Sequence, residues 1–307
     1  MKRVLFGVIL ASLAAGSILL GGVVIAFMMS LGCCLCGLEF IGLAEAKGYK
    51  PSRRIVMFMI IAFHMLAMLP ALPLVIIQWT GIHMTASDAL SQFPTLLTLG
   101  ICASFFRLLF RSEQPPATIA DIASTIMGFI YVGWLPAHLV LLRSTMPPSL
   151  GDVHIANPLH QPGLAYVWVS LFIIWATDVF AYYVGKKWGK HKLFPEISPK
   201  KTVEGALGGM LASAIVATMV VYAADHWLFS SHPFQFKLWQ APLMGIVVSI
   251  AAQLGDLCES LMKRDAGLKD SSQAIPGHGG FLDRGDSLMF GSPVSFYWIK
   301  IVVLGLY

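Results

Sequence analysis

Long apolar segments dominate the pattern of hydrophobic and polar positions along the chain. Each approaches or exceeds the roughly 20 residues that one membrane-crossing helix needs, and short polar connections separate them. The expected spans are residues 4–20, 22–45, 55–79, 92–107, 118–141, 164–185, 206–224, 240–257 and 288–306. The pattern predicts an all-α polytopic membrane protein of about nine transmembrane helices, in one domain over residues 1–307.

Some boundaries follow from single residues. Gly21 and the glycine after it predict a break between the first two spans. Glu39 and Glu45 interrupt the second span, and two prolines, Pro70 and Pro73, predict that the third is kinked or divided into a re-entrant pair. Within the single domain we expect N-terminal helices over 1–145, and catalytic helices and loops over 164–307.

The composition agrees with a membrane protein, because 57% of the residues are hydrophobic and only 12% are charged, with a mean hydropathy of +0.74. The N-terminal stretch is too long for a signal peptide and is interpreted as a retained helix. The net charge of +5 does not indicate nucleic acid, because the basic residues are dispersed between apolar spans. The five cysteines lack zinc-site or disulfide spacing, which favours plain packing.

The basic residues also predict the orientation. With the N-terminus inside, 18 of the 21 Lys and Arg residues fall on cytoplasmic segments or helix ends. The C-terminus then faces outside. The two longest polar tracts, residues 186–205 and 258–287, share the cytosolic side, where a cytosolic nucleotide could reach both.

A polar stripe runs along the end of the eighth span. Gln253, Asp256, Ser260 and Lys263 stand at offsets of 0, 3, 7 and 10 residues, so helical geometry places them on one face. A solvated stripe at an interfacial helix end is the plain alternative. Asp256 lies deep enough, however, that an unpaired carboxylate would be costly.

A glycine-rich connection follows and ends in two acids, Asp283 and Asp286. Its glycines allow successive N–H groups to turn toward phosphate oxygens, while Lys269 and Arg284 neutralise charge. The two acids can share a helix face and bind Mg²⁺, with Asp256 completing the site. Helix capping is the alternative for both acids, and a histidine in a glycine turn, such as His278, is often only a hydrogen-bonding residue.

The second tract begins with Asp178, an acid inside an apolar helix, where a polar cavity or partner is expected. Two interpretations of its six lysines between residues 186 and 201 stay open, as topology signals or as attraction to anionic lipid headgroups. Residues 198–205 resemble a phosphate-contacting turn that leads into a helix.

Together these residues resemble the phosphatidate cytidylyltransferase (CDP-diacylglycerol synthase) family. The C-terminal signature consists of Ser260, Lys263, Arg264, Lys269, Asp270, residues 276–280, Asp283, Arg284 and Asp286. The earlier matches are Asp178, Ala181, Tyr182, Gly185, Ser198, Pro199, Lys201, Thr202, Glu204 and Gly205. The resemblance is strong over residues 164–307. Gly285 and Phe180 depart from the pattern, and Gly285 loosens a helix start by about 1 kcal/mol relative to Ala.

The resemblance implies that phosphatidate and CTP give CDP-diacylglycerol and pyrophosphate, with Mg²⁺ required and a second cation left open. It implies catalytic roles for Asp256, Ser260, Lys263, Lys269, His278 and Arg284. Substrate-binding roles fall on Asp178, Tyr182, Ser198, Lys201, Thr202 and Glu204, and metal-binding roles on Asp256, Asp283 and Asp286. The resemblance also implies a homodimer. A short chain without a transit peptide favours a bacterial inner membrane as its location.

Three other readings stay open on sequence. A polyprenol or phytol kinase would transfer the γ-phosphoryl group of CTP and release CDP. A CDP-archaeol type synthase would share the chemistry and differ in its lipid. An ion-coupled transporter would use Asp178 and Asp256 in a proton or cation path, without consuming CTP.

Overall fold

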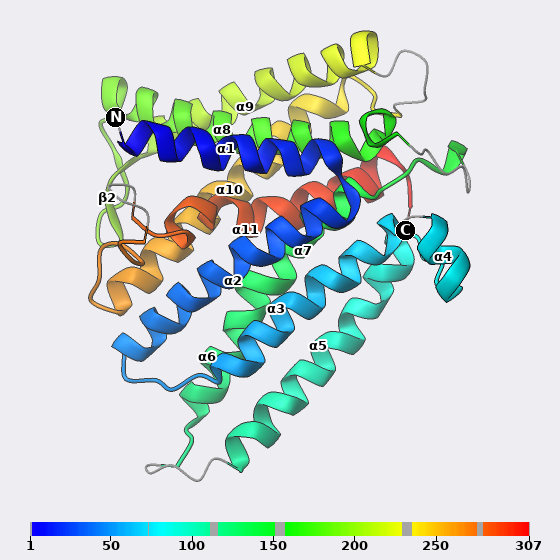
Figure 1. The fold of residues 1–307 in the computed structure, drawn as a ribbon. Helices are drawn as coiled ribbons and strands as arrows, with labels where there is room; N and C mark the ends of the chain where they lie inside the picture. Colours follow the sequence, from blue (N-terminus) through cyan, green and yellow to red (C-terminus); the bar gives the residue numbers. More distant parts are fainter. Residues whose placement is uncertain are drawn as a thin grey trace. The chain divides into compact units, whose positions relative to one another are not determined.

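Helices make up most of the chain, with one short β-hairpin between α8 and α9 (Figure 1). The structure is a computed structural model that describes residues 2–72, 74–110, 116–150, 157–228, 235–274 and 279–306. The α-helices are α1 (Lys2–Leu20), α2 (Gly22–Ala46), α3 (Arg53–Met68), α4 (Leu74–Thr80), α5 (Ala86–Leu109), α6 (Ile119–Phe129), α7 (Leu135–Arg143), α8 (Pro162–Trp188), α9 (Val203–Ala223), α10 (Gln240–Asp265) and α11 (Leu282–Tyr297). The predicted all-α class is confirmed.

Shorter elements connect or extend these helices. The 3₁₀ turns are η1 (Leu69–Ala71), η3 (Pro148–Leu150) and η4 (Pro158–His160). The π-helical segments η2 (Ile130–Trp134), η5 (Ala224–Leu228) and η6 (Trp298–Val303) continue α6, α9 and α11. The hairpin consists of β1 (Lys192–Phe194) and β2 (Ser198–Thr202), which pair antiparallel.

Seven helical segments in the described parts of the chain are long and apolar enough to cross a membrane. They are Gly22–Ala46, Arg53–Ala71, Ala86–Leu109, Ile119–Arg143, Pro162–Trp188, Val203–Trp227 and Gln240–Asp265. The multi-pass prediction is confirmed. The number nine is not, because the N-terminal helix offers only a shorter apolar stretch, Ala11–Leu20, and α11 has 16 residues.

Gly21 separates α1 from α2, as its position predicts. Its φ is +63°, and a Cβ there would lie 2.6 Å from Arg143 Nη2. The same arginine donates from Nε to the Ile18 carbonyl oxygen over 2.9 Å. Any other side chain at Gly21 would be strained and would displace the guanidinium, so this turn requires glycine.

The third predicted span is divided, as its prolines indicate. Helix α3 ends at Met68, the turn η1 contains Pro70, and α4 begins at Leu74. Proline cannot donate the hydrogen bond that would continue α3. Pro73 lies outside the described residues.

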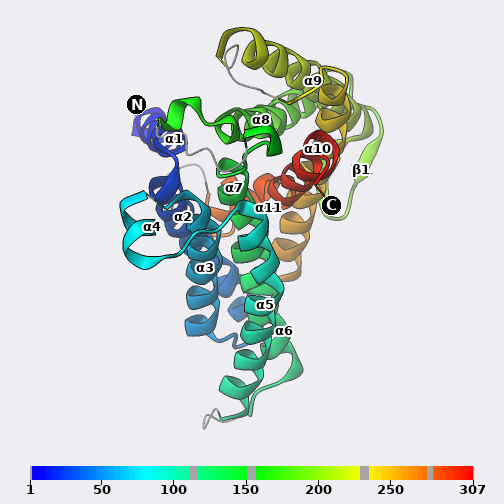
Figure 2. The same ribbon diagram turned by 90° about the vertical axis from the view of Figure 1, so that its right-hand side faces the viewer.

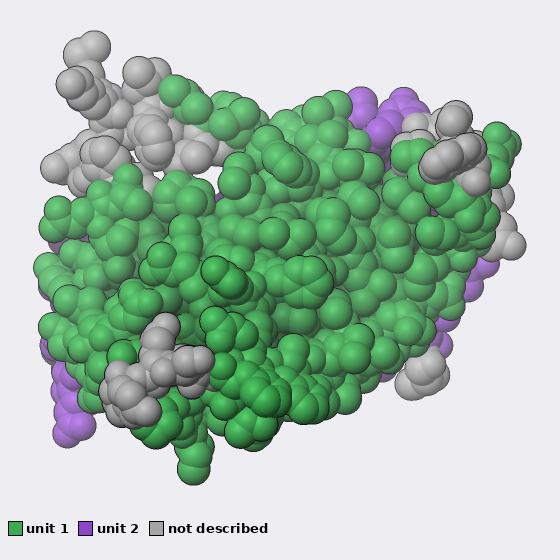
Figure 3. Space-filling view, turned by 60° about the horizontal axis from the view of Figure 1, so that its bottom comes forward, with its two compact units in different colours: residues 1–144, 262–285 green, residues 145–261, 286–307 purple. Residues whose placement is uncertain are grey.

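The chain forms two compact units, coloured separately in Figure 3. Unit 1 contains residues 1–144 and 262–285, and unit 2 contains residues 145–261 and 286–307. Residues 262–285 therefore pack with the N-terminal helices, whereas the sequence grouped them with the C-terminal ones. Apolar periodicity could not reveal this, because the segment is polar.

In unit 1, helices α2 and α3 lie side by side (Figures 1 and 2). Their facing side chains, together with those of the α6 to α7 segment, form a buried apolar core. Its members include Ile41, Val56, Ile60, Phe129 and Val132. Packing in this core holds α2 in position, and Glu39 of α2 contacts the segment that follows α10.

In unit 2, helices α8 and α9 pack closely through small residues. A Cβ on Gly209 would lie 2.9 Å from the Thr177 carbonyl oxygen, so only glycine allows this approach. Thr177 and Ser213 hydroxyls hydrogen-bond across the pair at 2.7 Å. The hairpin joins the two helices, and Lys192 pairs with Thr202 where α9 begins.

Candidate functional site

Two glycines shape the chain as it enters α11. Gly279 has φ +81°, and a Cβ on it would lie 2.8 Å from Asp283 Oδ2. A Cβ on Gly280 would overlap the Ser271 hydroxyl and the Glu39 carboxylate. The absence of side chains therefore lets the backbone approach two carboxylates closely.

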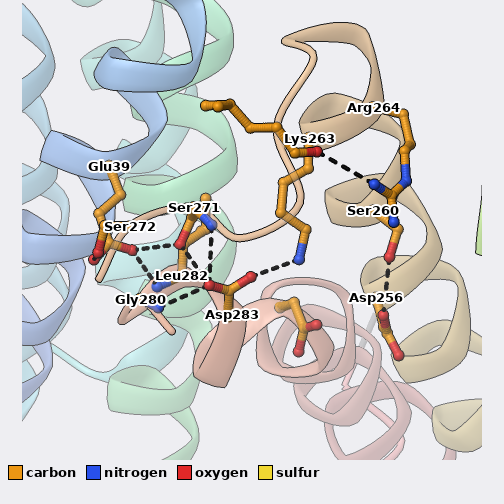
Figure 4. Close-up of polar contacts among 12 residues, drawn as sticks. Glu39, Asp256, Ser260, Lys263, Arg264, Ser271, Ser272, Gly280, Leu282 and Asp283 are labelled. Carbon is orange, nitrogen blue, oxygen red and sulfur yellow. Dashed lines mark hydrogen bonds and ion pairs between the residues drawn. The ribbon is translucent and has the colours of Figure 1, made fainter. Parts of the chain in front are cut away.

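The first of these carboxylates, Asp283, stands in the first turn of α11. Its Oδ1 accepts a hydrogen bond from Lys263 Nζ over 2.5 Å. Its Oδ2 accepts from Gly280 N over 2.7 Å, Ser271 Oγ over 2.9 Å and Ser271 N over 3.0 Å. Figure 4 shows these contacts, which belong to unit 1.

These contacts set the charge state of Asp283. Burial acts to raise the pKa of its carboxyl, but the hydrogen bonds from Lys263 and Gly280 outweigh burial and lower the pKa from 3.8 to about 2. Asp283 and Lys263 are a nearly buried ion pair, with side chains 9% and 13% exposed. The Asp283 carboxyl is therefore ionised over the whole physiological pH range.

The second carboxylate is Glu39 of α2, which is 8% exposed. Its Oε1 accepts from Ser272 Oγ over 2.6 Å and from Phe281 N over 3.0 Å. Its Oε2 accepts from Leu282 N over 2.8 Å and lies 2.8 Å from Ser271 Oγ, whose single hydrogen is shared with Asp283 Oδ2 (Figure 4). We call Glu39, Lys263, Ser271, Ser272, residues 280–282 and Asp283 the Glu39–Asp283 cluster.

The sequence pattern alone indicates no functional role for Glu39. The available signal was an acid in an apolar helix, which usually marks a polar partner. The cluster also changes the expectation for the glycine-rich connection. The N–H groups of residues 280–282 bind the protein's own carboxylates, whereas the sequence favoured phosphate oxygens.

A second cluster lies in unit 2. Lys201 Nζ, on β2, lies 2.6 Å from Asp256 Oδ2 on α10. The Lys201 and Asp256 side chains are 26% and 30% exposed, but the Lys201 Nζ atom itself is buried. Ser260 Oγ lies 3.5 Å from Asp256 Oδ1, one helical turn along α10.

Asp286 and Asp178 complete this second cluster. Ser287 N donates to Asp286 Oδ1 over 2.6 Å, and Ser287 Oγ donates to Asp178 Oδ1 over 3.3 Å. The fold thus brings together five predicted site residues from α8, β2, α10 and α11, namely Asp178, Lys201, Asp256, Ser260 and Asp286. We call Asp178, Lys201, Asp256, Ser260, Asp286 and Ser287 the Asp256–Asp286 cluster.

The acids of this cluster affect each other. Burial raises the pKa of the Asp286 carboxyl, and the negative charges of Asp256 and Asp178 raise it further. The positive charge of Lys201 acts in the opposite direction.

Several predicted substrate residues have structural partners in unit 2. Thr202 caps α9, because its Oγ1 accepts from Gly205 N over 3.1 Å. Glu204 accepts from Lys190 N over 3.0 Å and from His191 Nδ1 over 2.6 Å. These contacts close the loop before the hairpin, and they do not test the substrate-binding roles.

The other predicted residues that the structure describes lie on α8, in the hairpin and within residues 262–285. Tyr182 is 61% exposed on α8, and Ser198 pairs with Phe194 in the hairpin. Lys269 and Arg284 are exposed. His278 lies outside the described residues, so its predicted role stays a prediction.

The predicted metal ligands fall into different units, since Asp283 belongs to unit 1 and Asp256 and Asp286 belong to unit 2. Over the described ranges, no group of three or more His, Cys, Asp or Glu side chains forms a ready metal site. The Asp256–Asp286 cluster nevertheless holds one cation, the Lys201 ammonium, against Asp256. Its carboxylate oxygens are donors of the kind that hard divalent ions prefer, and the expectation of Mg²⁺ stays a prediction.

Comparison with known proteins finds relatives whose sequences match most of this chain. The model of the cytidylyltransferase family matches residues 1–302, which include every residue of both clusters. A phosphatidate cytidylyltransferase from Synechocystis sp. is 35% identical over 98% of this chain and 97% of its own length. Proteins of the same name from Staphylococcus haemolyticus and Bacillus subtilis are 35% and 33% identical, over 73% and 70% of this chain and 75% and 71% of their own lengths.

Proposed function

The chain belongs to the cytidylyltransferase family, and we propose that it transfers the cytidylyl group of CTP to phosphatidate, giving CDP-diacylglycerol and pyrophosphate for phospholipid biosynthesis. The observation that carries the proposal is the Asp256–Asp286 cluster. It places a lysine and three acids from four elements together. A reaction between two phosphates needs groups of both signs, because anions must be neutralised and a metal ion must be held.

The reaction is a substitution at the α-phosphorus of CTP. A lipid phosphate oxygen forms the new P–O bond, the bond to the β-phosphate breaks, and pyrophosphate leaves with the bonding electrons. A phosphate monoester is largely ionised at neutral pH, since its second pKa is about 6. The nucleophile therefore needs no general base, and the protein's work is to position the two substrates and to stabilise negative charge.

Asp256 and Asp286, with Asp178 beside them, would hold Mg²⁺, and a second cation is compatible with three acids. The ion would neutralise phosphoryl oxygens and the departing pyrophosphate when bound. Asp283 was also predicted to be a ligand. Its oxygens accept hydrogen bonds from Lys263, Ser271 and Gly280, which favours a positioning role for Asp283.

Cationic and hydroxyl side chains of the signature would bind the phosphates of the two substrates. Lys201 is the first candidate, because its ammonium already faces an acid cluster. The other proposed phosphate contacts are Ser198, Thr202, Ser260, Lys263, Lys269, His278 and Arg284, with Tyr182 and Glu204 bordering the substrates.

The protein is a multi-pass membrane protein, and we propose a bacterial inner membrane with the N-terminus and the polar tracts in the cytoplasm. The distribution of Lys and Arg supports this orientation. Large apolar side chains on the described helix surfaces, such as Phe58, Leu99, Leu211 and Met219, are exposed and suit lipid contact. We also propose a homodimer, as the family resemblance implies.

The test is an assay of the purified protein in detergent–lipid micelles with labelled CTP, phosphatidate and Mg²⁺. We expect cytidine label to enter the lipid phase and pyrophosphate to appear in equal amount, and omission of any component to stop both. Release of CDP with phosphate transfer to a polyprenol or phytol would identify a kinase. A preference for an archaeal-type lipid would identify a different CDP-lipid synthase.

A variant of Asp256 links this activity to the cluster. D256N should abolish Mg²⁺-dependent turnover while membrane insertion continues. E45Q is the matched control, because Glu45 is an exposed acid at the end of α2. Turnover by D256N within twofold of the unsubstituted protein would remove Asp256 from the proposed site.

A further inference from the structure

Glu39 is an acid inside the apolar helix α2, where an ionisable group is costly without partners. It is 8% exposed and accepts four hydrogen bonds. All four donors lie more than 230 residues further along the chain. The first half of the chain thus supplies an acceptor for the family's C-terminal signature.

The donors belong to one stretch of unit 1, the return segment, which we define as residues 270–274 and 279–283. Phe281 N and Leu282 N are free for Glu39 because the first N–H groups of a helix, here α11, lack partners within the helix. Glu39 therefore caps α11 from another helix. Its negative charge also suits the positive end of the helix dipole.

Glu39 is linked to Lys263 through two residues. Ser271 lies within hydrogen-bond distance of both Glu39 Oε2 and Asp283 Oδ2, at 2.8 and 2.9 Å. Asp283 in turn binds the Lys263 ammonium. The order Glu39, Ser271, Asp283, Lys263 is a continuous polar chain between α2 and the end of α10 (Figure 4).

We propose that Glu39 is a positioning residue for cytidylyl transfer, which holds the return segment so that Asp283 fixes the Lys263 ammonium for substrate phosphate. The inference rests on the proposed function for its kinetic part. Its structural part, the attachment of the return segment to α2, is independent of that function.

Two of the four donors face Glu39 Oε1 and two face Oε2, so both atoms at the end of this side chain must be acceptors. Gln would keep the size of Glu39 but would turn an N–H group toward at least two of the donors. Asp would keep both acceptors on a side chain that is one methylene shorter. Activity should therefore fall in the order Glu39, E39D, E39Q, which size alone does not predict.

The kinetic experiment compares the unsubstituted protein, E39D, E39Q and the control E45Q. Rates are measured per folded protein, with CTP and phosphatidate varied separately. We expect E39Q to lose about tenfold or more in kcat/KM for CTP, with a raised KM, because hydrogen bonds to a charged acceptor are lost. E39D should recover part of the loss, and E45Q should be unchanged.

Hydrogen exchange of the same proteins tests the attachment without activity. E39Q should lose protection in peptides that cover residues 279–283, while peptides from α9 should keep theirs. If E39Q does not fold, S272A replaces it, because this variant removes one donor to Oε1 and leaves the carboxylate. S272A should then lose part of the same protection and severalfold in kcat/KM for CTP.

The outcomes are distinguishable. If the unsubstituted protein makes no CDP-diacylglycerol but E39Q loses protection at 279–283, the proposed function fails and the attachment stands. If the unsubstituted protein turns over and E39Q equals it in kcat, KM and exchange, the positioning role is overturned. A lower yield of folded E39Q with unchanged kcat and KM would also overturn it, since Glu39 would then serve stability alone.

Discussion

Lys201 and Asp256 form an ion pair at 2.6 Å that joins the hairpin strand β2 to helix α10 in unit 2. The pair connects the basic tract before α9 with the polar stripe on α10. The carboxyl of Asp286 interacts electrostatically with both residues of the pair, which act on its pKa in opposite directions. Lys201 therefore links the two motifs in unit 2 that the sequence presented separately.

Removal of the Lys201 ammonium should abolish most of the activity. K201M keeps the length of the side chain but leaves Asp178, Asp256 and Asp286 without their common counter-ion. We expect kcat/KM to fall about 100-fold or more, as for loss of a charged group at developing phosphate charge. Steady-state assays at saturating Mg²⁺ measure the effect.

Lys200 supplies the control for this prediction. It is exposed and adjacent on β2, and successive strand residues point to opposite faces. K200M should retain activity within about twofold, as surface substitutions usually do. Equal losses in K200M and K201M would mean that the tract acts through its total charge and not through the ion pair.

Much of the fold follows from local properties of the chain. The break at Gly21, the division at Pro70 and the helix that carries Asp256 are decided by single residues or by the periodicity of a few turns. The membrane spans follow from apolar length alone. For Lys201 and Asp256, the sequence predicted only that the two polar tracts near them lie on the same side of the membrane. It did not predict that these two residues form an ion pair.

The rest depends on contacts between distant residues. Glu39 could be recognised only as an acid in an apolar helix, because its partners lie far along the chain. The inclusion of residues 262–285 in unit 1 has the same cause, since hydrogen bonds to Glu39 and the Lys47–Asp265 ion pair attach that segment. Neither hydropathy nor motif spacing encodes these partners.

The ion pair of Asp283 predicts a dependence of stability on pH. The pKa of Asp283 is about 2 in the folded protein against 3.8 ordinarily, so its contribution is present above pH 3.8 and is lost as pH falls toward 2. D283N should reduce the free energy of unfolding by about 2 kcal/mol near pH 7. Denaturant titrations in mild detergent at pH 7, 5 and 3 measure the difference.

The difference between the unsubstituted protein and D283N should shrink at pH 3. E45Q is the control, because the Glu45–Arg53 pair at 3.7 Å is exposed and such pairs contribute little. A difference that stays constant down to pH 3 would contradict the assignment of the stabilisation to the Asp283 carboxylate.

Thr202 offers a test of capping against substrate binding. Its hydroxyl accepts from Gly205 N and it is 6% exposed, so T202A should destabilise the protein by about 1 kcal/mol, and T202S should not. T218A is the control, since Thr218 bonds back to Ala214 within the same helix. Unfolding measurements give the stability, and a raised KM in the folded T202A protein would instead support substrate binding.

Metal binding separates the roles of the three acids predicted as ligands. Mg²⁺ that binds only the folded protein should raise the melting temperature, and Mn²⁺ bound in its place can be counted by electron paramagnetic resonance. D256N and D286N should lose both the shift and the bound Mn²⁺, because their carboxylates belong to the acid cluster of unit 2. D283N should begin from a lower melting temperature but keep the metal-dependent shift, because Asp283 is engaged by Lys263 and Ser271. If D283N loses bound Mn²⁺ while D286N retains it, the ligand is Asp283, and its contacts with Lys263 and Ser271 must open when the ion binds.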